Sequence, residues 1–180
     1  MPVTVDAEAG YGMEPAELVA ALRSAGAAGC NLEDSDPADH SLRDPDAQAE
    51  WLAAVRAAAD GYGLVINARV DVFFGPLLAG AGPGTQAELV PEALRRANAY
   101  LDAGVDCVYP IGLWEMAALR SFMAGAHGPV NIVPMPPMLA PEMPSVPELA
   151  ALGVARVSWA IALYREAMAH FEKQLASLRD

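Results

Sequence analysis

Six short apolar segments recur along the chain at nearly regular intervals. They are rich in valine and isoleucine and span residues 2–6, 27–33, 64–69, 105–111, 129–134 and 154–160. Their apolar residues are continuous rather than alternating, which is typical of strands that are covered on both faces in a parallel sheet. Their first residues are about 30 positions apart on average, the length of one strand with its crossover helix.

Helical patterns fill the segments between these runs. Pro15 and Pro45 suit the first turn of a helix, where a missing N–H leaves no helical bond unmade. Pro91 is also expected to begin a helix, because proline disrupts a helix interior. Ser145 and Glu148 have the spacing of a capping box. The predicted helices span residues 15–24, 46–59, 91–103, 114–124, 145–152 and 161–178.

A glycine separates a predicted helix from the next strand at three places, namely Gly26, Gly104 and Gly153. Glycine readily takes the left-handed conformation that ends many helices. The alternation of strand and helix predicts one α/β domain over residues 1–180. Two architectures fit, an open doubly wound sheet and a (β/α) barrel. A complete barrel takes about 250 residues, so this length and six parallel strands predict an incomplete TIM-type barrel, with helices outside and a long C-terminal helix.

The composition narrows the classes of partner. Hydrophobic residues make up 54% of the chain, which excludes a disordered protein, and 23 acidic against 11 basic residues give a net charge of −12. Such an acidic surface argues against nucleic acid and against membranes as partners. Cys30 and Cys107 each lie in an apolar run, which excludes a disulfide scaffold or a zinc cluster. Without a signal peptide pattern or a long apolar run, the chain is expected to be a soluble, cytoplasmic protein.

Charged side chains end the first three predicted strands. They are Asp6 and Glu8, then Glu33 and Asp34, then Arg69 and Asp71. In α/β folds the carboxyl ends of the strands form the active face. Carboxylates that cluster there repel one another unless a hard cation neutralises them, and Mg²⁺ prefers such oxygen ligands. The plainer alternative is that these acids cap the following helices or face solvent.

Three motifs carry a family resemblance. The segments VDAEAGYG (5–12), GCNLEDSD (29–36) and INARVDVF (66–73) resemble the phosphoenolpyruvate mutase/isocitrate lyase superfamily. The closing GPVNIVP and LGVARVSWAIALYREAM are similar to the last units of the same family. The resemblance covers nearly all 180 residues and keeps the motifs in family order. Within the family, the sequence most resembles members described as carboxyphosphonoenolpyruvate phosphonomutase-like.

The resemblance implies a fold and a chemistry. Members of the family are (β/α)₈ barrels that make or break C–C or P–C bonds in small α-keto acids or phosphonates through an enolate, with Mg²⁺ on the oxyanion. It implies metal contacts at Asp6, Glu8 and Glu33, with Glu8 in place of the usual aspartate. Arg69 would bind the anionic substrate, so the implied catalytic residues are Arg69, Glu33 and Asp6. The other residues implied to contact substrate are Gly10, Tyr11, Gly12 and Asn67.

Two departures from the family pattern qualify this assignment. Family lyases carry a loop with a cysteine shortly after the acidic motif, whereas residues 35–48 contain no cysteine. This disfavours a lyase mechanism in which a thiol is the general acid. His40 and Ser41 are the polar side chains that could serve in this loop instead. The first two βα units of the family are also absent from this sequence. The sequence is then either a fragment of a longer protein, or a chain whose gap another subunit covers, or a degenerate member of the family. The alternative function is therefore a truncated, catalytically incompetent member that acts as a subunit or binding protein.

The C-terminal helix has an apolar stripe of Leu163, Ala167, Phe171 and Leu175. One interpretation packs this stripe against the helix's own barrel. The family resemblance implies the other interpretation, in which the final helix is exchanged between subunits of a homodimer or homotetramer.

Overall fold

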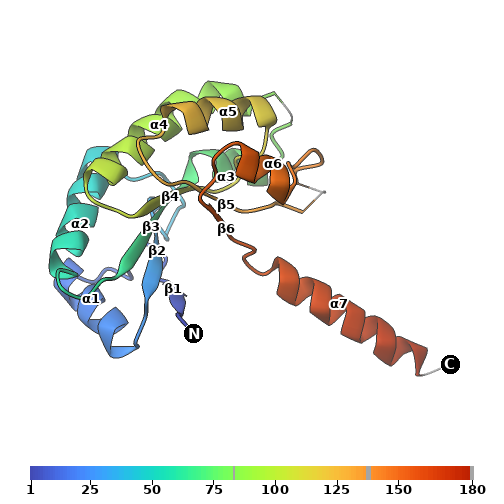
Figure 1. The fold of residues 1–180 in the computed structure, drawn as a ribbon, viewed down its shortest axis with the longest axis horizontal. Coiled ribbons are helices and arrows are strands. Elements are labelled where there is room, and N and C mark those ends of the chain that lie inside the picture. The colour runs from blue at the N-terminus through green and yellow to red at the C-terminus, as the bar shows by residue number, and fades with distance from the viewer. Residues whose placement is uncertain (83, 137–138, 179–180) are drawn as a thin grey trace.

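The chain folds into parallel strands that alternate with helices (Figure 1). The computed structural model describes residues 1–82, 84–136 and 139–178. Its six strands over these residues are β1 (Thr4–Asp6), β2 (Gly29–Glu33), β3 (Val65–Val70), β4 (Cys107–Pro110), β5 (Asn131–Ile132) and β6 (Arg156–Val157). The helices over the same residues are α1 (Pro15–Ser24), α2 (Pro45–Ala58), α3 (Phe74–Leu78), α4 (Gln86–Asp102), α5 (Met116–Gly125), α6 (Val146–Ala151) and α7 (Ala162–Ser177), with a 3₁₀ turn at Asp71–Phe73.

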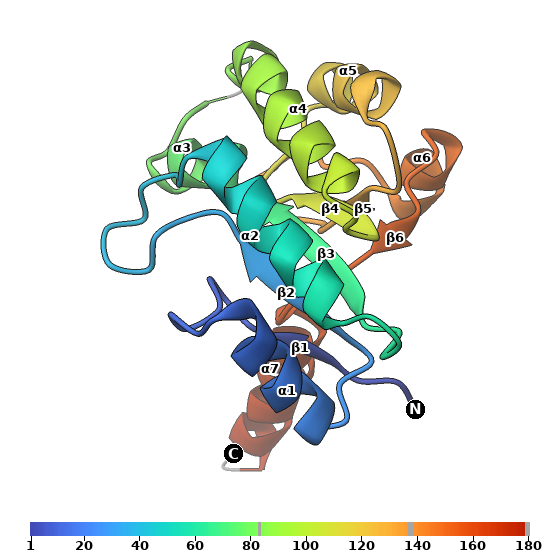
Figure 2. The same ribbon diagram turned by 90° about the vertical axis from the view of Figure 1, so that its left-hand side faces the viewer.

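The strands are ordered in space as they are in the chain. β1 to β4 form one parallel sheet, β5 pairs with β6, and a parallel bridge between Val108 and Val130 links the two sheets. The helices α1, α2, α4 and α5 lie along the outer side of this curved sheet (Figures 1 and 2). Sequential order with helices on one side excludes the doubly wound alternative. The predicted incomplete barrel is confirmed, and the barrel is not closed by the described residues.

The core lies between the outer face of the sheet and the helices. Leu32, Ile66, Ala68 and Val108 are fully buried there. Because side chains alternate along a strand, Glu33 and Arg69 project to the opposite, inner face. The alternation therefore separates a dry outer face from a polar inner face.

The three glycines predicted to end helices do so. Gly26, Gly104 and Gly153 have φ values of 69°, 95° and 87°. A side chain in this left-handed region would strain the backbone, so glycine allows each helix to stop and the next strand to begin at once.

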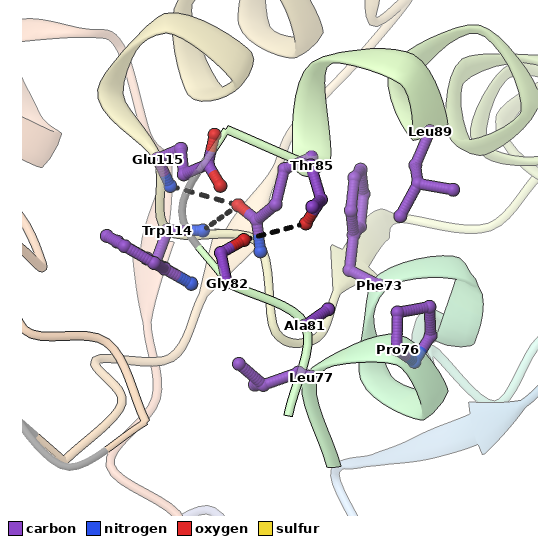
Figure 3. Close-up of a pocket in the computed structure, with 10 residues that line it drawn as sticks. Phe73, Pro76, Leu77, Ala81, Gly82, Thr85, Leu89, Trp114 and Glu115 are labelled. Carbon is purple, nitrogen blue, oxygen red and sulfur yellow. Dashed lines mark hydrogen bonds between the residues drawn. The ribbon is translucent and has the colours of Figure 1, made fainter. Parts of the chain in front are cut away.

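Helix α4 begins earlier than predicted. The expected start at Pro91 is wrong, because the helix begins at Gln86 and carries Pro91 inside it. The buried side chain of Gln86 accepts hydrogen bonds from the N–H groups of Trp114 and Glu115 and donates to the Gly112 carbonyl at 2.6 Å. Figure 3 shows Trp114, Glu115 and Thr85 around this point. These tertiary contacts hold the first turn in place despite the proline.

Helix α7 extends away from the body of the molecule (Figure 1). None of its described residues is buried, so the interpretation that its stripe packs on its own barrel is wrong. Its apolar side chains are more than a third exposed at Leu163, Tyr164, Met168, Phe171 and Leu175. Among the described residues, no helix combines the length and the apolar character needed to cross a membrane.

Candidate active site

The registers of β1, β2 and β3 bring their charged ends together. Asp6 is paired with Asn31, and Glu33 is paired directly with Arg69. The Glu33 N–H donates to the Glu8 carbonyl at 2.8 Å, which ties the loop after β1 to the end of β2. The backbone thus brings the three strand ends together, with Glu33 beside Arg69 and the loop that carries Glu8 beside Glu33.

Arg69 is the hub of this cluster. Its Nη2 donates to Glu33 Oε2 at 2.6 Å, and its Nη1 donates to Glu33 Oε1. Nε and Nη2 donate to the two Asp71 oxygens at 2.6 and 2.7 Å. These four bonds leave one of the five guanidinium N–H groups, on Nη1, for a ligand. The guanidinium also lies over the Phe74 ring, 5.5 Å from its centroid.

A buried second layer fixes Asp71. The Ser35 hydroxyl donates to Asp71 Oδ2 at 2.6 Å, and the Asp71 N–H donates to Asp34 Oδ1 at 2.9 Å. Asp34 is fully buried and also accepts from the Tyr100 hydroxyl at 2.8 Å and from Arg96 at 3.2 Å. Helix α4, which supplies both donors, therefore holds the end of β3 in position through Asp34.

The loop after β1 has an unusual backbone. Glu8, Gly10, Tyr11 and Gly12 all have positive φ, and a Cβ on Gly10 would lie 2.7 Å from the Trp51 ring. The turn exposes Tyr11 and directs its hydroxyl to the Asp6 carbonyl at 3.3 Å. Burial and then the charges of Glu8, Asp6 and Glu33 raise the Tyr11 pKa.

The cluster carries an excess of negative charge. Burial, together with the charges of Asp71, Asp6 and Glu8, raises the Glu33 pKa to about 7 against the lowering effect of Arg69. The Arg69 guanidinium pairs with Glu33 and Asp71, and the charges of Asp6 and Glu8 also act on Glu33. No ready-made group of three metal ligands exists among the described residues. Mg²⁺ needs only one or two carboxylates besides water and substrate oxygens, so uncompensated hard oxygen donors fit such a cation.

Asn67, the remaining residue expected to contact substrate, is buried within the sheet. It is 1% exposed, and its amide nitrogen donates to Asn31 Oδ1 at 2.8 Å. Its Oδ1 is buried without a partner among the described residues. The structure thus places Asn67 beneath the charged cluster, in the inner face of the sheet.

Asp71 was noted in the sequence as a strand-end acid but was not selected as a site residue. The signal was available in its spacing, because it follows Arg69 by two positions. The role of Asp34 was less accessible, since its partners Arg96 and Tyr100 are more than 60 residues away in the chain. Phe74 could not be selected from the sequence, because an apolar residue gives no indication that it lies beside a charged group.

A curved parallel sheet with helices outside it and charged side chains at its strand ends defines the class of α/β-barrel proteins. The family model described as phosphoenolpyruvate phosphomutase matches residues 1–179. The chain belongs to the phosphoenolpyruvate mutase/isocitrate lyase superfamily.

Individual relatives agree with this family. A probable 2-methylisocitrate lyase of Corynebacterium glutamicum is 31% identical, over 99% of this chain and 57% of its own length. A crystal structure from Burkholderia cenocepacia J2315, provisionally named a phosphonomutase, is 42% identical with a TM-score of 0.85, over 98% of this chain and 69% of that one. A phosphonopyruvate hydrolase solved with oxalate and Mg²⁺ is 26% identical with a TM-score of 0.76. The match covers 99% of this chain and 61% of the hydrolase chain. The chain spans little more than half the length of the curated relatives it matches.

Proposed function

We propose that this chain carries the Mg²⁺ and substrate site of a mutase or lyase that makes or breaks a C–C or P–C bond in a small α-keto acid or phosphonate through an enolate. The observation that carries the proposal is the convergence of Asp6, Glu8, Glu33 and Arg69 at the carboxyl ends of three consecutive strands. The complex of the phosphonopyruvate hydrolase with oxalate and Mg²⁺ supports the choice of ligand.

Each residue has a distinct role in this proposal. Asp6, Glu8 and Glu33 would hold Mg²⁺, in part through water. When bound, the cation supplies stabilisation of negative charge on the substrate's keto oxygen. Arg69 binds the carboxylate or phosphonate through its remaining N–H, while Glu33 and Asp71 hold its guanidinium in a fixed plane. Gly10, Tyr11 and Gly12 would contact the substrate from the loop after β1, as Asn67 would from β3.

Calorimetry with Mg²⁺ and oxalate, a mimic of the enolate, tests this function. We expect oxalate to release heat only when Mg²⁺ is present, because the cation neutralises the acidic cluster that otherwise repels an anion. The measurement is a titration of oxalate into the protein with and without Mg²⁺. Absence of binding in both titrations would contradict the proposal.

A second candidate is a family member that works as a subunit or binding protein without catalysis. The exposed apolar side chains of α7 favour it, because they offer a surface for another chain. This candidate predicts an oligomer whose melting temperature does not respond to Mg²⁺. Turnover of any keto acid or phosphonate would exclude it.

In either case we expect α7 to join copies of this chain into a homodimer or homotetramer. Large exposed apolar side chains are stabilised when a partner covers them. Phe171→Glu combined with Leu175→Glu should therefore reduce the mass measured by light scattering to that of one chain. Lys173→Gln on the same helix is the control and should leave the mass unchanged. A clean monomer of the unaltered protein would contradict the expectation.

A further inference from the structure

A cavity of about 540 Å³ opens beside the charged cluster. Glu33, Arg69 and Asp71 form one part of its wall. Leu42, Val72, Phe74, Pro76 and Leu78 form another part, which is apolar and comes largely from α3 and the turn before it. The cavity therefore joins an anion-binding end to a hydrocarbon surface.

The volume exceeds what a two- or three-carbon acid requires. Sites of roughly 300–1,000 Å³ are those that bury most of a drug-sized ligand. An oxalate or pyruvate molecule held by Arg69 would leave most of this cavity vacant. The structure thus provides room for a substituent on the acid.

The apolar wall is continuous with the residue that binds the anion. Phe74 lies against the face of the Arg69 guanidinium, 5.5 Å from the ring centroid to the Arg69 Cζ. Leu42 and Leu78 lie further along the wall and are 40% and 62% exposed. Burial of such side chains against a hydrocarbon chain is favourable, since each buried methylene removes apolar area from water.

Most polar side chains that line the cavity already have hydrogen-bond partners within the protein, so they do not need a partner on the substrate. The Ser35 hydroxyl already donates to Asp71 at 2.6 Å. Glu33 and Asp71 are engaged by Arg69. His40 is the other polar side chain of this lining, and it lies on the loop that carries Leu42. An apolar substituent would therefore leave few polar groups unpaired.

We propose that the substrate is an α-keto acid that carries an alkyl chain, with its acid group at Arg69 and its alkyl chain along Leu42, Phe74 and Leu78. This inference rests on the function proposed above and specifies its substrate class. It separates this site from one that would take only oxalate-sized or phosphonate substrates.

The test is a chain-length series measured by calorimetry at a fixed, saturating Mg²⁺ concentration. The probes are pyruvate, 2-oxobutanoate, 2-oxopentanoate and 2-oxohexanoate, with oxalate as the reference ligand. We expect each added methylene to tighten Kd by up to about fourfold. A Kd that does not change along the series, with oxalate still bound, overturns this inference and leaves the proposed function in place. Absence of oxalate binding overturns both.

Variants locate the alkyl chain. Leu78→Ser should reduce the ratio of the Kd values for pyruvate and 2-oxohexanoate to near one, because it removes the apolar wall. Leu42→Ser should reduce the same ratio. The matched control is Val146→Ser, which alters an aliphatic residue of α6 about as exposed as Leu42 and outside the cavity, and it should leave the ratio unchanged. An undiminished ratio in both Leu variants would place the chain elsewhere and overturn the proposal.

Discussion

Replacement of Arg69 by methionine is expected to abolish most oxalate binding while it strengthens the binding of Mg²⁺ alone. The guanidinium pairs with Glu33 and Asp71, and the charges of Asp6 and Glu8 add to the negative charge around Glu33, so loss of Arg69 makes the site more negative. Truncation of one member of a hydrogen-bonded charge pair typically costs about 2–5 kcal/mol, which corresponds to a loss of affinity of at least about 30-fold. Calorimetric titrations of each ligand measure the two opposite effects.

Arg56→Met is the matched control for this substitution. Arg56 also pairs with a carboxylate, that of Asp106, and donates to the carbonyls of Gly104 and Leu64 at 2.8 and 3.0 Å. These partners lie before β3 and β4, at the end of the strands opposite Arg69. The control should lower stability but leave the affinities for oxalate and Mg²⁺ unchanged. Equal losses in both variants would show that binding at Arg69 is not specific.

The strand ends were predictable because one geometric rule governs them. Parallel strands end at the same edge of a sheet, so Asp6, Glu33 and Arg69 had to approach one another once their apolar runs were recognised as neighbouring strands. The glycines at positions 26 and 104 were predictable for a similarly local reason, since they end helices by their own backbone freedom.

The start of α4 and the position of α7 were not predictable in this way. Pro91 argued locally for a later start, and contacts of Gln86 with residues 26 to 29 positions away outweighed it. The stripe on α7 is equally compatible with packing on its own barrel or on another chain, because periodicity identifies an apolar face without identifying what covers it. Both outcomes depend on tertiary contacts that a local pattern does not contain.

The charged cluster and the buried residues beneath it differ in the same way, because the first is positioned by local strand register and the second by tertiary contacts. Arg69 and Glu33 are placed by strand register, whereas Asp71 is held from below by Asp34, whose own partners come from α4. The loop between Asp34 and α2 is anchored by the same helix, because Arg96 donates to the Arg43 carbonyl at 2.8 Å. Helix α4 thus stabilises both the cavity wall and the charged cluster. Asp34 connects α4 to Asp71, so its loss would affect the stability of the fold and the geometry of the site.

Asp34→Asn is expected to be the most destabilising single substitution of this second layer. Asp34 is fully buried and Arg96 is 5% exposed, so the amide removes the buried counter-charge of this guanidinium and leaves it paired with the more exposed Glu92. Removal of one partner of a buried ion pair costs about 3–5 kcal/mol, a large share of the roughly 5–15 kcal/mol that stabilises a typical domain. Urea unfolding monitored by circular dichroism measures the change.

Two further variants test whether the loss of stability in Asp34→Asn comes from the buried charge of Arg96. Glu92→Gln removes an exposed partner of the same Arg96 and should cost less than about 1 kcal/mol. Arg96→Met added to Asp34→Asn should recover part of the lost stability, since it removes the guanidinium that has lost its buried partner. If the double variant is instead less stable than Asp34→Asn alone, the hydrogen bond from Arg96 to the Arg43 carbonyl outweighs the ion pair. In that case α4 stabilises the site through the loop backbone and not through Asp34.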